Sequence, residues 1–334
     1  QNFEIIIVDD GSTDKTFSVC NELKENDSRI CVVNQENSGS SAARNTGIMI
    51  ARGKYIVFID GDDCVDESFL NKLVLPTTQN DIDLVICGIT IYYQKQKYSI
   101  SRGFKKKKIV TDSDAVPEII YESCENGMIY SPCNKLYKRE VIIDNHILFP
   151  LYEEPIEDIL FNCEYMKHIH SIATIPECPY FYYKNDIASN VTRFRENIWD
   201  LSCQRSLSIQ LLFEHWKLNS EECTKWLASE YIGGKSDCIS NCYRYGSKLH
   251  FFDRYKLFKQ YIINDQKCWS FLTKLKGSPL YYDKRILSIL IRVRRALIFT
   301  LAYDILFFLR YKLCNIYYFF RKYEGIKSGN DKHK

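Results

Sequence analysis

Short apolar runs alternate with amphipathic segments through the N-terminal part of the chain. The runs are rich in β-branched residues and end at polar turns, which predicts strands at 3–8, 30–34, 55–59 and 83–87. Apolar residues at helical spacing predict helices from Ser12 or Thr13 to about Asn26, at 41–51 and at 66–75. This alternation is typical of an α/β fold with a parallel sheet, in which the first run (FEIIIV) would be buried on both faces.

The second half of the chain has a different pattern. A helix is predicted around 156–167, and residues 197 to about 266 have a helical pattern. In the segment 284–322 the apolar centre from Ala296 to Leu309 is too short to span a bilayer, and it contains Asp304. Arginine and lysine flank this centre, which favours a helix lying in a membrane interface, anchored by the aromatic run 317–320. The alternative is a helix pair packed on the catalytic body.

Composition limits the classes of protein that remain. A chain of 334 residues with 46% hydrophobic and 26% charged residues is globular, with about two domains, and is neither disordered nor collagen-like. The net charge of +3 conceals an asymmetry, because residues 284–334 carry 12 basic and 3 acidic residues. The tail is apolar and aromatic between its charges and the rest of the chain is acidic, so we expect the tail to bind a membrane surface and no nucleic acid.

The cysteines indicate a reducing compartment. The 14 Cys are scattered without a CxxC pair, so we expect reduced thiols in a cytoplasmic protein and no zinc site. The chain begins at Gln1 and enters a strand pattern within two residues, so we expect it to be cut from a longer chain.

Carboxylates gather where two of the predicted strands end. Asp9 and Asp10 follow the first strand, and Asp60, Asp62 and Asp63 follow the third. Ligands of open α/β sheets bind at the carboxyl ends of strands, so the two groups are expected to face one crevice. Crowded carboxylates repel one another unless a cation lies between them, and oxygen ligands suit Mg²⁺ or Mn²⁺. Such an ion commonly bridges to phosphates, which suggests a nucleoside diphosphate ligand.

Other sites rich in aspartate or glycine do not fit the sequence. An EF-hand loop starting at Asp60 needs Gly at its sixth and Glu at its twelfth position, where this chain has Val65 and Asn71. The turn after the first strand reads DDGSTD instead of GxGxxG, and there is no P-loop. Turn formation and helix capping explain Asp14 and Asp66, but they do not explain three carboxylates at one strand end.

At this point the chain resembles a known family. The segments NFEIIIVDDGSTDKT (2–16), NSGSSAARNTGI (37–48) and GKYIVFIDGDD (53–63) resemble family 2 glycosyltransferases of the GT-A fold in order and spacing. Further matches are NKLYKREVI (134–142), EDILF (157–161), 182–184 and 189–193. The resemblance implies a Rossmann-like nucleotide-binding sheet, mixed or parallel and flanked by helices, with a C-terminal helical extension. Family members begin with one more strand and helix, so the sheet is expected to be one strand short.

The resemblance also implies a domain organisation. Residues 1–195 would form the catalytic domain, N-terminally truncated, and 196–283 a helical region. Residues 284–323 would form a basic, aromatic segment that associates with the membrane, and 324–334 a polar tail.

The nucleotide and metal contacts follow from the same resemblance. Asp9 and Asp10 would contact the base or ribose, and Arg44 would lie near the nucleotide. The DGDD match would supply the ligands of Mn²⁺ or Mg²⁺, with the first of them also near the ribose: Asp60, Asp62 and Asp63.

The resemblance assigns the chemistry to the EDILF match. Asp158 would accept the proton of the acceptor hydroxyl as catalytic base, with Glu157 beside it. Taken alone, these two acids are also explained by a helix N-terminus, where the dipole favours negative charge. Lys135 and Arg193 are further candidates for phosphate or acceptor contacts.

The activity implied is metal-dependent, inverting transfer of a sugar from a nucleotide sugar, UDP-linked, to a polysaccharide or lipid-linked oligosaccharide. The enzyme would lie on the cytoplasmic face of the cell membrane. Two alternatives use the same observations: a nucleotidyl or phosphoryl transferase with the same aspartate–metal site, and a catalytically inactive, membrane-associated scaffold.

Overall fold

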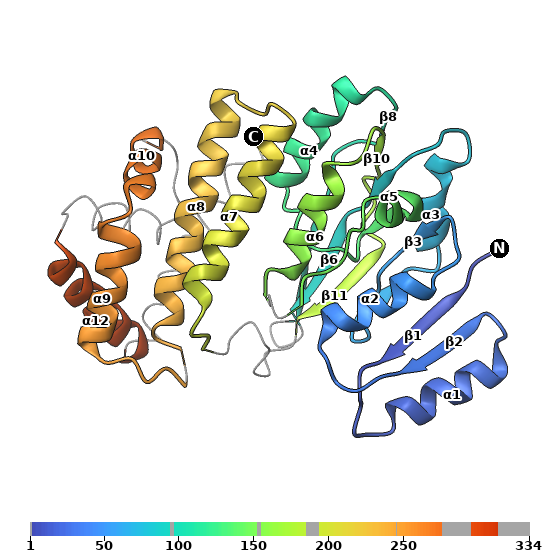
Figure 1. Ribbon diagram of the computed structural model, residues 1–334, viewed down its shortest axis with the longest axis horizontal. Helices are drawn as coiled ribbons and strands as arrows, with labels where there is room; N and C mark the ends of the chain where they lie inside the picture. Colours follow the sequence, from blue (N-terminus) through green and yellow to red (C-terminus); the bar gives the residue numbers. More distant parts are fainter. Residues whose placement is uncertain are drawn as a thin grey trace. The chain divides into compact units, whose positions relative to one another are not determined.

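The computed structural model describes residues 2–93, 97–151, 155–184, 194–244, 246–275 and 295–312. The chain divides into two compact units. The first unit comprises residues 1–191 and 200–226, and the second comprises 192–199 and 227–334. The candidate site lies in the first unit, whose strands and helices appear in blue, green and yellow in Figure 1.

The chain begins with a parallel pair of strands. β1 (Ile5–Asp9) and β2 (Ile30–Asn34) pair in register from Ile5 opposite Ile30 to Asp9 opposite Asn34, and Figure 1 shows them side by side. α1 (Thr16–Asn26) packs on both strands and α2 (Ser40–Ile50) packs on β1. The expectation that the first strand is buried on both faces is wrong. Ile5 is 38% exposed, because β1 has a hydrogen-bonded neighbour on one side only in the described residues.

The larger sheet of this unit is mixed rather than parallel. It has the order β3 (Tyr55–Ile56), β9 (Lys135–Lys138), β5 (Leu84–Ile86), β10 (Ile172–Thr174), β8 (Lys108–Val110), and only β5 and β10 run parallel. A further sheet has the order β4 (Cys64–Val65), β11 (Tyr180–Lys184), β6 (Ile89–Tyr93), β7 (Tyr98–Arg102). β9 separates β3 from β5, so the strands predicted at 55–59 and 83–87 are not neighbours.

The remaining elements are helical. The first unit continues with α3 (Phe69–Val74), α4 (Val116–Glu125), α5 (Arg139–Asp144), α6 (Glu157–Met166) and α7 (Ile198–His215), of which the last begins in the second unit. α8 (Glu221–Asn241) is shared by the two units, and the second unit holds α9 (Phe251–Phe258), α10 (Gln266–Lys274) and α12 (Ala296–Lys312). Single turns occur at Leu75–Thr77, Ser113–Ala115 and Lys259–Ile263. The helices predicted at 41–51 and 156–167 are confirmed as α2 and α6.

An aromatic cluster holds α6 against the larger sheet. Phe58, which follows β3, meets Tyr137 of β9 and Phe161 of α6 edge to face. Phe149 stacks on Phe161 with ring centroids 3.9 Å apart, and Tyr165 packs edge to face on Tyr137. Each of these rings is buried, so each contributes roughly 2–3 kcal/mol of apolar burial. The cluster fixes the position of the first turn of α6, which carries Glu157 and Asp158.

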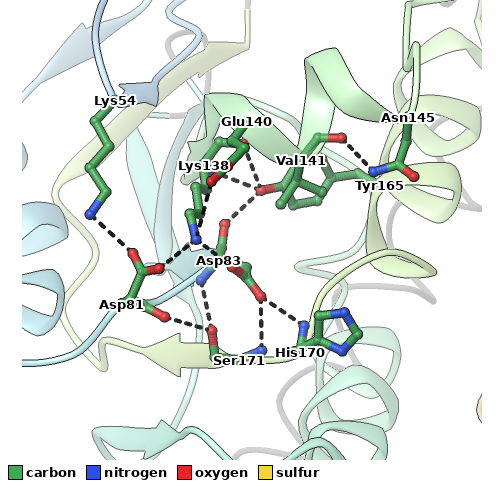
Figure 2. Close-up of polar contacts among 10 residues, drawn as sticks. All are labelled: Lys54, Asp81, Asp83, Lys138, Glu140, Val141, Asn145, Tyr165, His170 and Ser171. Carbon is green, nitrogen blue, oxygen red and sulfur yellow. Dashed lines mark hydrogen bonds and ion pairs between the residues drawn. The ribbon is translucent and has the colours of Figure 1, made fainter.

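A polar network ties together the amino ends of β3 and β5 (Figure 2). Buried Asp83 accepts the backbone N–H groups of His170 at 2.8 Å and Ser171 at 3.2 Å, and Tyr165 donates its hydroxyl to the Asp83 carbonyl at 2.6 Å. Lys138 pairs with Asp83 at 3.4 Å and with Asp81 at 2.6 Å. Asp83 is therefore a buried charge whose partners come from three different segments, whereas the Asp81 side chain is 59% exposed.

In the second unit the helices share an apolar core. Phe258 of α9 meets Phe299 of α12 edge to face at 5.4 Å, and Trp199 stacks on Tyr261 at 5.0 Å. Among the helices that the structure describes, none combines the length and the apolarity that crossing a bilayer requires.

The difference between Asp83 and Asp81 predicts a difference in stability. We expect Asp83→Ala to lower the free energy of unfolding by about 3 kcal/mol, because it leaves backbone donors and Lys138 without their buried acceptor. Asp81→Ala removes an exposed partner of the same lysine and is expected to cost about 1 kcal/mol or less. Urea unfolding of both variants measures the two values, and equal losses would contradict the role assigned to Asp83.

Candidate functional site

Arg44 joins two acidic residues that are far apart in the sequence. It projects from α2 and donates from Nη1 to Asp158 Oδ1 at 2.6 Å and from Nη2 to Asp60 Oδ1 at 2.8 Å. Its side chain is only 13% exposed, and its guanidinium lies over the Phe149 ring at 5.1 Å. The structure therefore brings together the ARN, DGDD and EDILF segments around one buried cation.

The residue after Arg44 fixes the ring beneath it. Asn45 donates its side-chain amide to the Phe149 carbonyl at 2.8 Å and accepts the Phe149 backbone N–H at 2.8 Å. This reciprocal pair holds Phe149 between the aromatic cluster and the guanidinium. The sequence analysis assigned no role to Asn45 or Phe149, although Asn45 stands inside the quoted NSGSSAARNTGI segment.

Asp158 lies at the N-terminus of α6 and is half-buried, with 32% of its side chain exposed. Burial raises the pKa of its carboxyl, and the neighbouring charge of Arg44 acts in the opposite direction. Burial alone would lower the pKa of Arg44, but the charges of Asp158 and Asp60 raise it. Glu157 precedes Asp158 in the same first turn and is also buried. The site thus holds a carboxylate that stays paired yet is more basic than an exposed aspartate.

The aspartates of the DGDD segment have different environments. Asp62 is exposed, and Asp60 binds Arg44. Asp63 accepts the Tyr180 hydroxyl at 2.6 Å on one oxygen and the Tyr183 backbone N–H at 3.1 Å on the other. Tyr180 also accepts the backbone N–H of Asp60 at 3.3 Å. Asp63 therefore anchors the segment to β11, and burial raises the pKa of its carboxyl.

Fewer carboxylates are open to a metal ion here than the three that the sequence predicts. In the part of the chain that the structure describes, no group of three or more His, Cys, Asp or Glu is arranged to hold a metal. Asp63 already accepts one hydrogen bond on each oxygen, whereas Asp62 is exposed and Asp60 has one oxygen paired with Arg44, so Asp62 and Asp60 are the more open carboxylates for this role. Mg²⁺-type sites commonly use one or two carboxylates together with substrate phosphates, so this donor set fits such an ion.

The two aspartates after β1 are held differently from each other. Asp10 accepts from Gln35 Nε2 and Ser38 N on Oδ1 at 2.7 and 3.0 Å, and from Gly39 N on Oδ2 at 2.7 Å. Because a carboxylate oxygen has two acceptor positions, Oδ2 of Asp10 keeps room for one more donor. Asp9 is buried at 4% exposure, and it accepts from Asn34 on Oδ2 at 2.7 Å. Its Oδ1 has no hydrogen-bond partner among the described residues.

The turn after these aspartates needs a glycine. Gly11 has φ of +75°, and a Cβ at this position would lie 2.8 Å from the backbone nitrogen of Asn37. The DDG turn therefore packs directly on the loop that Asp10 organises.

Lys135 is completely buried beneath the site. Its Nζ donates to the Met128 carbonyl at 2.6 Å, to the Ser131 carbonyl, and to Asn134 Oδ1 at 2.9 Å. Burial lowers the pKa of Lys135 to about 7. Three acceptors need three N–H donors, which only the protonated amine has. A contact between Lys135 and a phosphate would break these bonds. Arg193 lies outside the described residues.

Part of the chain matches a known protein family. Residues 1–145 match the family model described as glycosyl transferase family 2. The chain is 28% identical to the putative glycosyltransferase EpsH of Bacillus subtilis, over 76% of the chain and 72% of EpsH. It is 45% identical to the glycosyltransferase GlyG of Streptococcus pneumoniae, over 44% of the chain and half of GlyG.

The fold also recurs in a solved structure. The crystal structure of residues 1–349 of Staphylococcus aureus TarS superposes with a TM-score of 0.59, covering 93% of this chain and 82% of TarS at 18% identity. The identification from the sequence is confirmed for this part of the chain: residues 1–145 match glycosyl transferase family 2, and the chain has the GT-A fold seen in TarS.

Proposed function

We propose that the chain transfers a sugar from a nucleotide sugar, UDP-linked, to a glycan or lipid-linked glycan, with inversion at the anomeric carbon. The observation that carries the proposal is the bridge from Arg44 to Asp60 and Asp158. This bridge joins Asp60, in the segment that would hold the diphosphate, to Asp158, which would take the proton of the acceptor hydroxyl.

The nucleoside would lie at the carboxyl end of β1. The buried, unpartnered Oδ1 of Asp9 and the remaining acceptor position on Asp10 Oδ2 both suit donors of a base or ribose. The DDG turn and the loop 35–39 are already fixed by the bonds of Asp10, so little ordering would be needed on binding.

The diphosphate would lie next to Asp60 and Asp62. These two residues would hold Mn²⁺ or Mg²⁺, and a bound divalent cation supplies neutralisation of the charge that develops on the leaving diphosphate. Asp63 would act by fixing the segment through Tyr180 rather than as a ligand.

Asp158 would act as the general base. Arg44 occupies its Oδ1, so the proton of the acceptor hydroxyl would pass to Oδ2. The hydroxyl oxygen would form a bond to the anomeric carbon while the bond to the diphosphate oxygen breaks, and the nucleoside diphosphate would leave with that electron pair. A base whose pKa is raised by burial accepts a proton more readily than an exposed aspartate.

We propose that the catalytic domain spans residues 1–195, followed by the helical region 196–283. We also propose that the enzyme is peripheral on the cytoplasmic face of the membrane, attached through 284–323, of which the structure describes residues 295–312.

A nucleoside diphosphate release assay tests the proposal. UDP-, GDP- and dTDP-linked sugars are offered with Mn²⁺ or Mg²⁺ to the wild type, Asp62→Asn and Asp158→Asn, with Glu67→Gln as an exposed control from the same segment. We expect metal-dependent release of nucleoside diphosphate by the wild type and by the control. Asp62→Asn should lose this metal-dependent release, and Asp158→Asn should show at least about a 100-fold fall in kcat.

Two results of that assay would overturn the proposal. Formation of pyrophosphate from a nucleoside triphosphate and a sugar 1-phosphate would identify a nucleotidyl transferase. No release together with no nucleotide binding would identify an inactive scaffold.

The Arg44–Asp158 pair predicts a change in pH dependence. In Arg44→Gln the charge that lowers the pKa of Asp158 is gone while burial remains, so this pKa rises further. The base must be ionised to act, so activity would be lost at a higher pH as the solution is acidified. We expect the acidic limb of the kcat/KM profile to move up by about one pH unit. An acidic limb that does not move would contradict the pairing of Arg44 with Asp158. The control is Arg52→Gln, which removes an exposed arginine bound to Glu4.

A further inference from the structure

α12 carries apolar side chains on both its inner and its outer face. Its inner face, formed by Ala296, Phe299, Thr300 and Tyr303, is buried in the second unit, where Phe299 and Tyr303 pack against Phe258 of α9. This face of α12 therefore packs against the helices of its own unit.

The acidic residue of α12 belongs to that packing. Asp304 accepts two hydrogen bonds from Arg254, at 3.0 and 2.9 Å, and one from the Tyr243 hydroxyl at 2.5 Å. These bonds neutralise the only charged residue between Ala296 and Phe308. They also fix which face of α12 points outward.

The outer face of α12 consists of large apolar side chains. Five of them are 41% to 62% exposed: Leu297, Ile298, Leu301, Ile305 and Phe308. At 3.6 residues per turn these positions fall within about 100° of the circumference and form one continuous stripe. A surface helix of a soluble protein normally carries polar residues opposite its buried face. An exposed apolar stripe of this size indicates a binding surface.

The charge of the sequence around α12 indicates what binds there. Arg295 is exposed immediately before α12, and residues 284–334 of the sequence carry 12 basic and 3 acidic residues. Two copies of this chain meeting through this face would each bring a strongly basic segment, which opposes association. An anionic lipid surface satisfies both features, since apolar side chains enter the headgroup boundary while basic side chains stay among the phosphates.

We propose that the outer face of α12 docks this enzyme on an anionic lipid surface, with Leu301, Ile305 and Phe308 entering the boundary between headgroups and acyl chains. The inference rests on the proposed function, because it names the surface by which an enzyme of lipid-linked or envelope glycans would reach the membrane. It differs from a general attachment of residues 284–323 because it names the side chains that insert and those that do not.

Vesicle flotation of the full chain tests the proposal. The vesicles are phosphatidylcholine alone, or equal parts of phosphatidylcholine and phosphatidylglycerol. The test variant is Leu301→Glu/Ile305→Glu. The matched control is Leu207→Glu/Leu211→Glu, which changes two similarly exposed leucines of α7. We expect the wild type and the control to float with the anionic vesicles and less with phosphatidylcholine. The ratio of bound to free protein should fall about tenfold or more in the α12 variant.

Further measurements keep the outcomes distinct. Phe308→Ser changes a side chain that is 62% exposed and should give a smaller loss of vesicle binding in the same direction. It replaces the double variant if circular dichroism shows that the double variant is unfolded.

Equal flotation of the wild type and the folded α12 variants would overturn the proposal. A wild-type dimer that the α12 variants dissociate would also overturn it and identify an interface between copies. Nucleoside diphosphate release without vesicles should be the same in all variants, and its absence throughout would contradict the proposed activity while leaving the docking result intact.

Discussion

The burial of one positive charge organises the candidate site. The Arg44 guanidinium is nearly inaccessible to water, and a buried cation is costly unless its donors are satisfied by nearby acceptors. Asp60 and Asp158 meet this requirement at 2.8 and 2.6 Å, and the Phe149 ring lies against the guanidinium. Each of these three partners comes from a different part of the chain. The position of the DGDD segment relative to the first turn of α6 is therefore a consequence of where Arg44 sits in α2.

Neighbouring residues make this arrangement rigid. Asn45 binds the backbone of Phe149 in both directions, and Phe149 stacks on Phe161 of α6. On the opposite side, Tyr180 holds Asp63 and the backbone of Asp60, so that the DGDD segment is fixed to β11. A site held in this way needs little reorganisation when a substrate binds, and preorganised charge is the largest contribution to many enzymatic reactions.

The sequence predicts the parts of this fold that depend on local pattern. The β1–β2 strands, α2 and α6 could be expected from apolar periodicity. The quoted motifs mark Arg44, Asp60 and Asp158 as site residues, but they do not show that Arg44 pairs with both aspartates. The insertion of β9 between β3 and β5 could not be predicted, because residue 135 pairs with residue 86 and periodicity says nothing about distant partners.

Lys135 was misleading for a related reason. A lysine is usually expected to face solvent or a phosphate, whereas three acceptors surround this one and keep it buried. Tyr180 carried no signal of its own, since one tyrosine among 24 is unremarkable until its hydroxyl is seen beside Asp63. For α12 the charge pattern indicated an interfacial helix, but only the bonds of Asp304 distinguish its inner face from its outer face.

A double-mutant cycle on Arg44 and Asp158 tests the central interaction most directly. The free energy of unfolding would be measured for the wild type, Arg44→Met, Asp158→Asn and the double variant. If the pair organises the site, Arg44→Met leaves Asp158 without its cationic partner and Asp158→Asn leaves Arg44 with Asp60 alone, whereas the double change removes the interaction from both sides. The account therefore predicts a coupling energy of about 1–3 kcal/mol between the two positions. Effects that add to within about 0.5 kcal/mol would show that Arg44 and Asp158 act independently, and would contradict the account.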